Sequence, residues 1–251
     1  KSSVLTNIPP IMFGTAYDYF RGLTSGIYWK TKGLKRRAGF GYLPLPGFEV
    51  VLHLSYEHNN FITGLNFSES GTLLEEFSPN HTGKVELSGT YNLEISKTGG
   101  WMFSTNTSIG YLSNSEVDSF FHFFGGGLPG MKGYPFYSIE GTKKGIETIS
   151  LRIPILKNYN IPVGVFTFQN SSLGCVYSIG DAWRQKDEIE LKHSAGVELR
   201  FNGFSFYNYP TAISMEIHRG LSSFTNEIGG ETLKFGGENQ FYLSILFGFN
   251  N

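Results

Sequence analysis

Apolar and polar residues alternate strictly from residue 84 to residue 96, and this pattern limits what the chain can fold into. Successive side chains of a β-strand point to opposite faces, so a period of two over thirteen residues predicts one long strand with one apolar and one polar face. The apolar face carries Val85, Leu87, Gly89, Tyr91, Leu93 and Ile95, and the polar face carries Lys84, Glu86, Ser88, Thr90, Asn92, Glu94 and Ser96. A similar segment, residues 101–111, follows a glycine-containing turn, so the two segments predict a hairpin.

The same alternation recurs along most of the chain and predicts an all-β fold. Seven further segments show it clearly, namely residues 49–57, 61–68, 147–155, 161–180, 193–201, 212–219 and 240–249. Weaker alternation marks three segments within the less regular residues 1–45, namely 11–20, 24–31 and 37–43, and brings the expected number of strands to about twelve. Tight turns such as residues 57–60 alternate with long connections, at residues 69–83, 112–146, 181–192 and 220–239.

The composition of the chain argues against several classes of protein. Only 16 % of the residues are charged, whereas soluble domains usually carry about a quarter. No stretch approaches the ~20 consecutive apolar residues that a membrane helix needs. A net charge of −1 without a long basic run predicts no nucleic-acid partner. The six histidines and the single Cys175 show no metal-ligand spacing, and no nucleophile motif is present, so we expect no metal, no cofactor and no enzymatic activity.

The length and ends of the strands favour a transmembrane antiparallel β-barrel. Segments of nine or more residues exceed the five or six that are typical of soluble sheets and match the ~9–11 tilted residues that cross a bilayer. Aromatic residues lie near the segment ends, at Trp29, Tyr56, Trp101, Tyr111 and Trp183. Apolar faces would then contact lipid and polar faces would line the interior. Alternation alone does not say which face is outside, so a soluble sandwich or a soluble lipid-binding barrel is the alternative.

The longest connection, residues 112–146, carries a glycine-rich motif. Its central part reads Met131, Lys132, Gly133 and Tyr134, and the pair Glu140 and Gly141 follows. This stretch resembles the signature loop of the BamA-type superfamily, the bacterial surface antigen family, in which an apolar residue, Arg, Gly and an aromatic residue precede a Glu-Gly pair.

The resemblance extends to the end of the chain. Residues 151–155 and 176–183 are similar to the family's next two strands, and five predicted strands lie within residues 147–251, the number that the family places there. The last one ends in Phe247, Gly248 and Phe249, which are similar to the family's C-terminal aromatic assembly signal. The resemblance covers about residues 112–251, whereas the first hundred residues match only in strand character.

The resemblance implies that residues 1–251 form one barrel with the long extracellular loop folded into its lumen. The family barrel has sixteen strands, so this chain is expected to be a piece of a longer protein or a smaller relative. Lys132 stands where the family has Arg, and Ser178 stands where Asp is usual. The expected partners of Lys132 on the lumen wall are first Asp181 and Glu140, then Glu198 and Glu216.

The resemblance also implies a function at the outer membrane of a Gram-negative bacterium. The barrel would insert or translocate unfolded or nascent polypeptides through a lateral seam between its first and last strands, because an unpaired strand edge can pair with a client strand. Gly248 would weaken the local ladder of the last strand and ease this opening. Outer-membrane lipids, and periplasmic modules or lipoproteins, are the other expected partners. The alternative is a passive channel, or an anchor for an attached periplasmic or surface domain.

Overall fold

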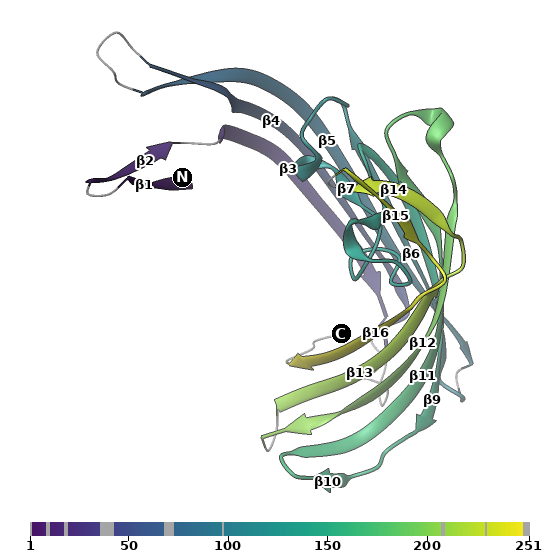
Figure 1. The fold of residues 1–251 in the computed structure, drawn as a ribbon. Helices are drawn as coiled ribbons and strands as arrows, with labels where there is room; N and C mark the ends of the chain where they lie inside the picture. The colour runs from purple at the N-terminus through teal and green to yellow at the C-terminus, as the bar shows by residue number, and fades with distance from the viewer. Residues whose placement is uncertain are drawn as a thin grey trace.

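The chain folds into β-strands that build one large antiparallel sheet, as a computed structural model shows (Figure 1). The structure describes residues 2–8, 11–17, 20–35, 43–67, 73–96, 98–206, 209–228 and 230–247. The predicted all-β class is therefore confirmed. Within these residues, no helix is long and apolar enough to cross a membrane.

The sheet has ten strands, nine of which follow one another as hydrogen-bonded antiparallel neighbours. Their order across the sheet is β3 (Phe20–Leu34), β4 (Gly47–Phe67), β5 (Leu73–Ser96), β6 (Trp101–Leu112), β9 (Lys143–Leu156), β11 (Phe166–Trp183), β12 (Lys192–Ser205), β13 (Tyr209–Gly220) and β16 (Asn239–Phe247). The short β10 (Ile161–Val163) pairs with β11. No pairing within the described part of the chain joins β3 to β16, so both are edge strands there.

The remaining elements are short. Three two-stranded ribbons are formed by β1 (Ser2–Ile8) with β2 (Ile11–Tyr17), by β7 (Phe123–Phe124) with β8 (Glu140–Gly141), and by β14 (Phe224–Ile228) with β15 (Glu231–Phe235). Three single-turn 3-10 helices are η1 (Ser119–Phe121), η2 (Phe136–Ser138) and η3 (Lys186–Glu188). The connection between β6 and β9, residues 113–142, contains β7, β8, η1 and η2, and we call it the central loop.

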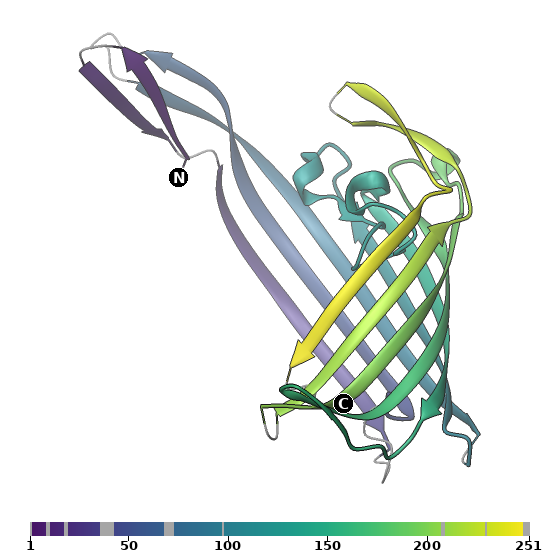
Figure 2. The same cartoon turned by 60° about the horizontal axis from the view of Figure 1, so that its bottom comes forward.

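The sheet is strongly curved, and the central loop lies on its concave side (Figures 1 and 2). The side chains that face the loop are mostly polar and are buried, for example Glu198 at 5 % exposure, Ser214 at 3 % and His218 at 2 %. Large apolar side chains of the same strands point to the convex face and are exposed, for example Val197 at 45 % and Met215 at 50 %. The two faces therefore have the reverse of the polarity usual in a soluble protein.

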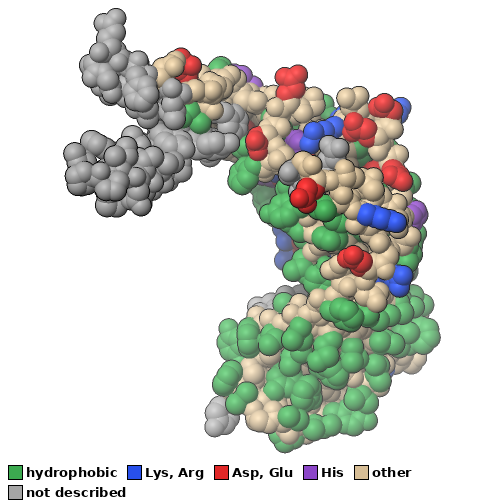
Figure 3. Space-filling view, viewed as in Figure 1, with side chains coloured by type: hydrophobic (Ala, Val, Ile, Leu, Met, Phe, Trp, Pro, Cys, Tyr) green, Lys and Arg blue, Asp and Glu red, His purple; other side chains and the backbone are tan. Residues whose placement is uncertain are grey.

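The exposed apolar side chains are not scattered. They cover the strands β11, β12, β13 and β16 as a continuous surface, whereas Lys, Arg, Asp and Glu gather around β14, β15 and the neighbouring connections (Figure 3). Along the edge strand β16, every second residue contributes to this surface, with Phe241, Leu243, Ile245 and Phe247 all more than half exposed.

Several predicted boundaries are wrong, and the main error concerns β4 and β5. Residues 57–60, predicted as a turn, lie inside β4, and residues 73–83, predicted as part of a long connection, belong to β5. Residues 57–60 pair with residues 79–82, for example His58 with His81 and Asn59 with Asn80, and the pairing of β4 with β5 continues to Leu73 after a register shift between Ile62 and Gly64. Ladder hydrogen bonds join backbone groups, so polar side chains do not by themselves end a strand.

Two further predicted boundaries differ, and one predicted strand is not covered. The predicted strand 161–180 is divided into β10 and β11 by a turn at Gly164, whose φ of 62° suits glycine. The predicted connection 220–239 contains the β14–β15 ribbon. Of the predicted strand 37–43, residues 37–42 lie outside the described residues.

Candidate functional site

The central loop has internal structure and packs against the sheet. Its glycine-rich part closes on itself through backbone hydrogen bonds from Gly125 to Ile139, from Gly127 to Tyr134 and from Met131 to Gly125. Met131, Tyr134 and Ile139 are buried, and they pack with Ile146 of β9 and Ala182 of β11 in one hydrophobic cluster. Internal bonding of this kind satisfies polar backbone groups that would otherwise be buried against the sheet without partners.

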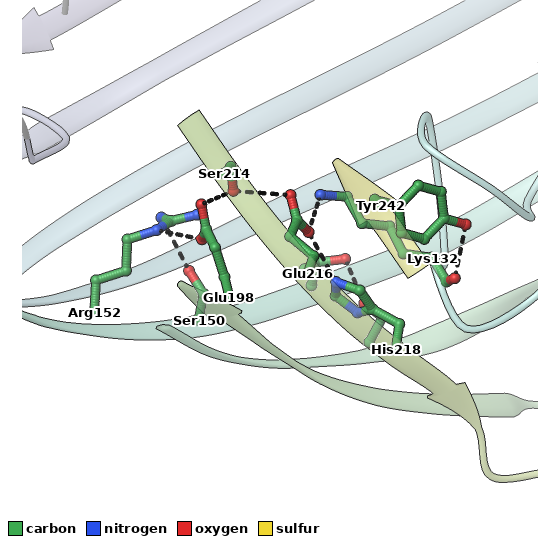
Figure 4. Close-up of polar contacts among 10 residues, drawn as sticks. Lys132, Ser150, Arg152, Glu198, Ser214, Glu216, His218 and Tyr242 are labelled. Atoms are coloured by element: carbon green, nitrogen blue, oxygen red, sulfur yellow. Dashed lines mark hydrogen bonds and ion pairs between the residues drawn. The ribbon is translucent and has the colours of Figure 1, made fainter. Parts of the chain in front are cut away.

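Lys132 joins the central loop to the two last strands of the sheet (Figure 4). Its ammonium group lies 2.5 Å from the Glu216 carboxylate of β13, which also contacts His218 Nε2 at 2.8 Å. The Tyr242 hydroxyl of β16 donates a hydrogen bond of 2.9 Å to the Lys132 carbonyl oxygen. Since the Glu216 side chain is only 7 % exposed, solvent screens this ion pair less than it would a pair on the open surface, although the Lys132 side chain is 29 % exposed.

Tyr134 attaches the central loop to the sheet at a second place, near the start of β12 and the end of β13. Its hydroxyl lies 2.7 Å from the His193 carbonyl oxygen and 3.0 Å from the Ser222 carbonyl oxygen, and it accepts a hydrogen bond from the Ser222 N–H at 3.1 Å. Two glycines allow this close approach. A Cβ atom on Gly133 would lie 2.6 Å from the Arg219 carbonyl carbon, and one on Gly220 would lie 2.5 Å from the Tyr134 ring.

The Gly133→Ala substitution should therefore loosen the loop. The added methyl group meets backbone atoms, which cannot turn aside as a side chain does, so we expect a loss of about 1–3 kcal/mol in the free energy of unfolding. Gly89→Ala in β5 is the matched control, because a Cβ atom there has nothing within 4 Å. Chemical denaturation of both variants measures the difference. Equal stability of the two variants would contradict the close packing at Gly133.

A chain of polar contacts crosses the concave face from β9 to β16 (Figure 4). Arg152 Nε donates to Glu198 at 2.9 Å, and the Ser214 hydroxyl bridges the carboxylates of Glu198 at 3.1 Å and Glu216 at 3.4 Å. Two cations, Arg152 of β9 and Lys132 of the central loop, thus pair with two acids, Glu198 and Glu216. The attraction within each pair offsets part of the desolvation cost of placing these charges on a largely buried wall.

The loop and this polar wall border a partly open cavity of about 380 Å³. Its lining includes hydroxyl and amide side chains of β5, β6 and β9, together with the charged groups above: Ser88, Thr90, Asn106, Ser108, Thr148, Ser150, Arg152, Glu198, Glu216 and Lys132. The hydroxyl, amide and charged groups of this lining can hydrogen-bond to water or to a polar ligand.

The structure brings Lys132 together with the last of its predicted partners. Glu216 contacts it, whereas the preference for Asp181 and Glu140 was wrong. Asp181 lies 2.7 Å from the Lys192 ammonium, and Glu140 lies 2.7 Å from the Arg184 guanidinium. Glu198 pairs with Arg152 (Figure 4). Ser178 of β11 shares a hydrogen bond of 2.9 Å with Thr148, which lies opposite it on β9.

The remaining site residues predicted from the sequence lie away from the Lys132 contacts or outside the described residues. Gly141 lies against the backbone of β11, where a Cβ atom would come within 2.3 Å of the Trp183 nitrogen. Phe247 is the last residue of β16, and Gly248 and Phe249 lie outside the described residues. Sequence reasoning missed Lys192, Tyr242 and His218. In the part of the chain that the structure describes, no group of three or more His, Cys, Asp and Glu is arranged to hold a metal ion.

Comparison of the chain with family models, with curated proteins and with solved structures finds no match.

Proposed function

We propose that this chain forms the membrane-spanning part of an outer-membrane β-barrel. The supporting observation is the reversed polarity of the sheet, with exposed apolar side chains on the convex face and buried polar ones on the concave face. On the convex face of β6, the aromatic residues Trp101 and Tyr111 lie ten residues apart. At ~3.4 Å per residue and a tilt of ~40°, ten residues span about 26 Å, which matches the ~25 Å apolar band of outer-membrane barrels.

The same apolar surface would make a soluble monomer prone to association. Contiguous apolar patches larger than a few hundred Å² are rare on soluble monomers and lead to association. Here the apolar side chains of the convex face extend over four neighbouring strands (Figure 3). The buried wall carries Glu198, Arg152 and Glu216, which a soluble sandwich would place in bulk solvent instead.

We further propose that the barrel inserts or translocates polypeptides, as its resemblance to the BamA-type superfamily implies. The supporting feature is the edge of the sheet, since β16 pairs only with β13 and β3 pairs only with β4 among the described residues. Backbone N–H and C=O groups on such an edge can add a strand of another polypeptide. The central loop contacts β16 through Tyr242, so the state of the loop affects the strand to which the client would pair.

Disulfide cross-linking to a client tests this function. Ile27 of β3, Ile245 of β16 and Ile149 of the central strand β9 are all exposed on the convex face. Each is replaced by cysteine in a Cys175→Ser background, and the variants are reconstituted in phospholipid vesicles. An unfolded small outer-membrane barrel with one cysteine in its last strand is then added. We expect cross-links at Ile27→Cys and Ile245→Cys but not at Ile149→Cys, together with faster insertion than into empty vesicles.

Cross-links of equal yield at all three positions, or insertion no faster than into empty vesicles, would refute polypeptide insertion at the edges. A steady ion conductance that does not respond to the client would instead favour the passive channel.

A further inference from the structure

Two histidines lie side by side on β4 and β5, outside the lining of the cavity and the contacts of Lys132. His58 of β4 and His81 of β5 are direct partners in the antiparallel register. Their rings are stacked with centroids 4.5 Å apart, and their Nδ1 atoms are 3.2 Å apart. The Tyr56 hydroxyl lies 2.6 Å from the same His81 Nδ1 atom. Three groups that can bind a metal ion therefore converge on one exposed spot.

The pair lies beyond the end of β6, where β5 is left without a second neighbour while β4 still pairs with β3, with Leu23 opposite His58. Lys84 is the first residue of β5 that pairs with β6, and β5 runs for eleven further residues on the other side, from Leu73 to Gly83. The β4–β5 hairpin projects from the rest of the sheet in Figure 2. His58 and His81 are thus accessible to a small solute.

The contacts of His81 Nδ1 are not compatible with two good hydrogen bonds. A ring nitrogen offers either one N–H or one lone pair, and this atom has both the Tyr56 hydroxyl and His58 Nδ1 within hydrogen-bond distance. A cation bound to both histidines would remove this conflict, after the stacked rings turn so that their in-plane lone pairs converge on it. Zn–N bonds of ~2.0–2.1 Å at tetrahedral angles place two ligand nitrogens ~3.3 Å apart, close to the observed separation.

We propose that His58 and His81, with Tyr56 beside them, bind a divalent transition-metal ion of the kind that imidazole ligands prefer, Zn²⁺ or Cu²⁺. Water completes the coordination, because only two or three protein groups are present. The site does not depend on the function proposed above. Sequence spacing did not reveal it, since the two histidines are 23 residues apart and only the strand register brings them together.

Binding of CuCl₂ and ZnCl₂ to the purified full chain in detergent micelles tests this site. We expect one equivalent of Cu²⁺ with two nitrogen ligands in the electron paramagnetic resonance spectrum, and competition by Zn²⁺ in titration calorimetry. Because even changes outside the ligand set lower metal affinity by ~10–100-fold, His58→Ala and His81→Ala should each lower it at least about tenfold. Tyr56→Phe should have a smaller effect.

His193→Ala is the matched control, because His193 Nδ1 also lies 2.6 Å from a tyrosine hydroxyl, that of Tyr177, in a tyrosine–histidine pair that resembles the one at His81. This variant should bind the metal ion as the unmodified protein does. Circular dichroism of each variant checks that the sheet is intact. The proposal is overturned if His58→Ala and His81→Ala bind as tightly as His193→Ala, or if no bound Cu²⁺ shows two nitrogen ligands.

Discussion

The Met215→Arg substitution should lower the free energy of unfolding from a lipid bilayer by about 2–4 kcal/mol, the cost of an arginine near the middle of a barrel's lipid-facing surface. Met215 is half exposed on the convex face of β13, between Leu199 of β12 and Leu243 of β16. In the proposed orientation its side chain meets hydrocarbon, where a guanidinium loses its hydration. Denaturant titration in phosphatidylcholine vesicles, followed by tryptophan fluorescence, measures the change.

Two control variants separate the effect of placing a charge in lipid from the effects of the charge itself and of replacing Met215. Ser88→Arg places the same charge on the concave side of β5, where Ser88 is exposed toward the cavity, and should change stability by no more than about 0.5 kcal/mol. Met215→Leu keeps an apolar side chain and should also be nearly neutral. In a soluble sheet, an arginine at an exposed position is tolerated, so equal stability of Met215→Arg and Ser88→Arg would contradict the membrane orientation.

The sequence determines the faces of this sheet more directly than the lengths of its strands. Alternation is a local property, because each side chain points opposite to its neighbour, and residues 84–96 therefore disclose an apolar and a polar face without any tertiary information. The extent of β4 and β5 depends on pairing between distant segments. Polar residues such as Asn59 and Asn60 look like a turn until the opposite strand is known.

The partners of the charged residues also depend on pairing between distant segments, which the local sequence does not show. The sequence predicts Asp181 as a partner of Lys132, but β11 and β12 form an antiparallel pair in which Gly180 lies opposite Lys192, so Lys192 is next to Asp181. Hairpin pairing could have shown this from the sequence. The contact between Lys132 and Glu216 joins residues 84 positions apart, and it depends on how the central loop packs on the sheet, which no local pattern contains.

The Lys132→Ala substitution should release the central loop from β13 and β16. It leaves the Glu216 carboxylate, which is buried, with His218 and a long contact to Ser214. Removing one partner of a buried charged pair costs the desolvation of the group that remains, about 1–3 kcal/mol for a hydrogen-bonded group of this kind. The same unfolding titration measures the loss. Limited proteolysis of the reconstituted protein should show faster cleavage within residues 113–142.

A double-mutant cycle separates this contact from a general loss of stability. If Lys132 and Glu216 interact as their separation indicates, Lys132→Ala and Glu216→Gln together should destabilise less than the sum of the two single substitutions, with a coupling energy of about 1 kcal/mol or more. Arg184→Ala is the matched control, because Arg184 also ties the loop to the sheet, through Glu140, but is half exposed and should cost at most about 1 kcal/mol. Strict additivity at Lys132 and Glu216, with cleavage no faster than in Arg184→Ala, would mean that the loop is held by the packing of Met131 and Tyr134 alone.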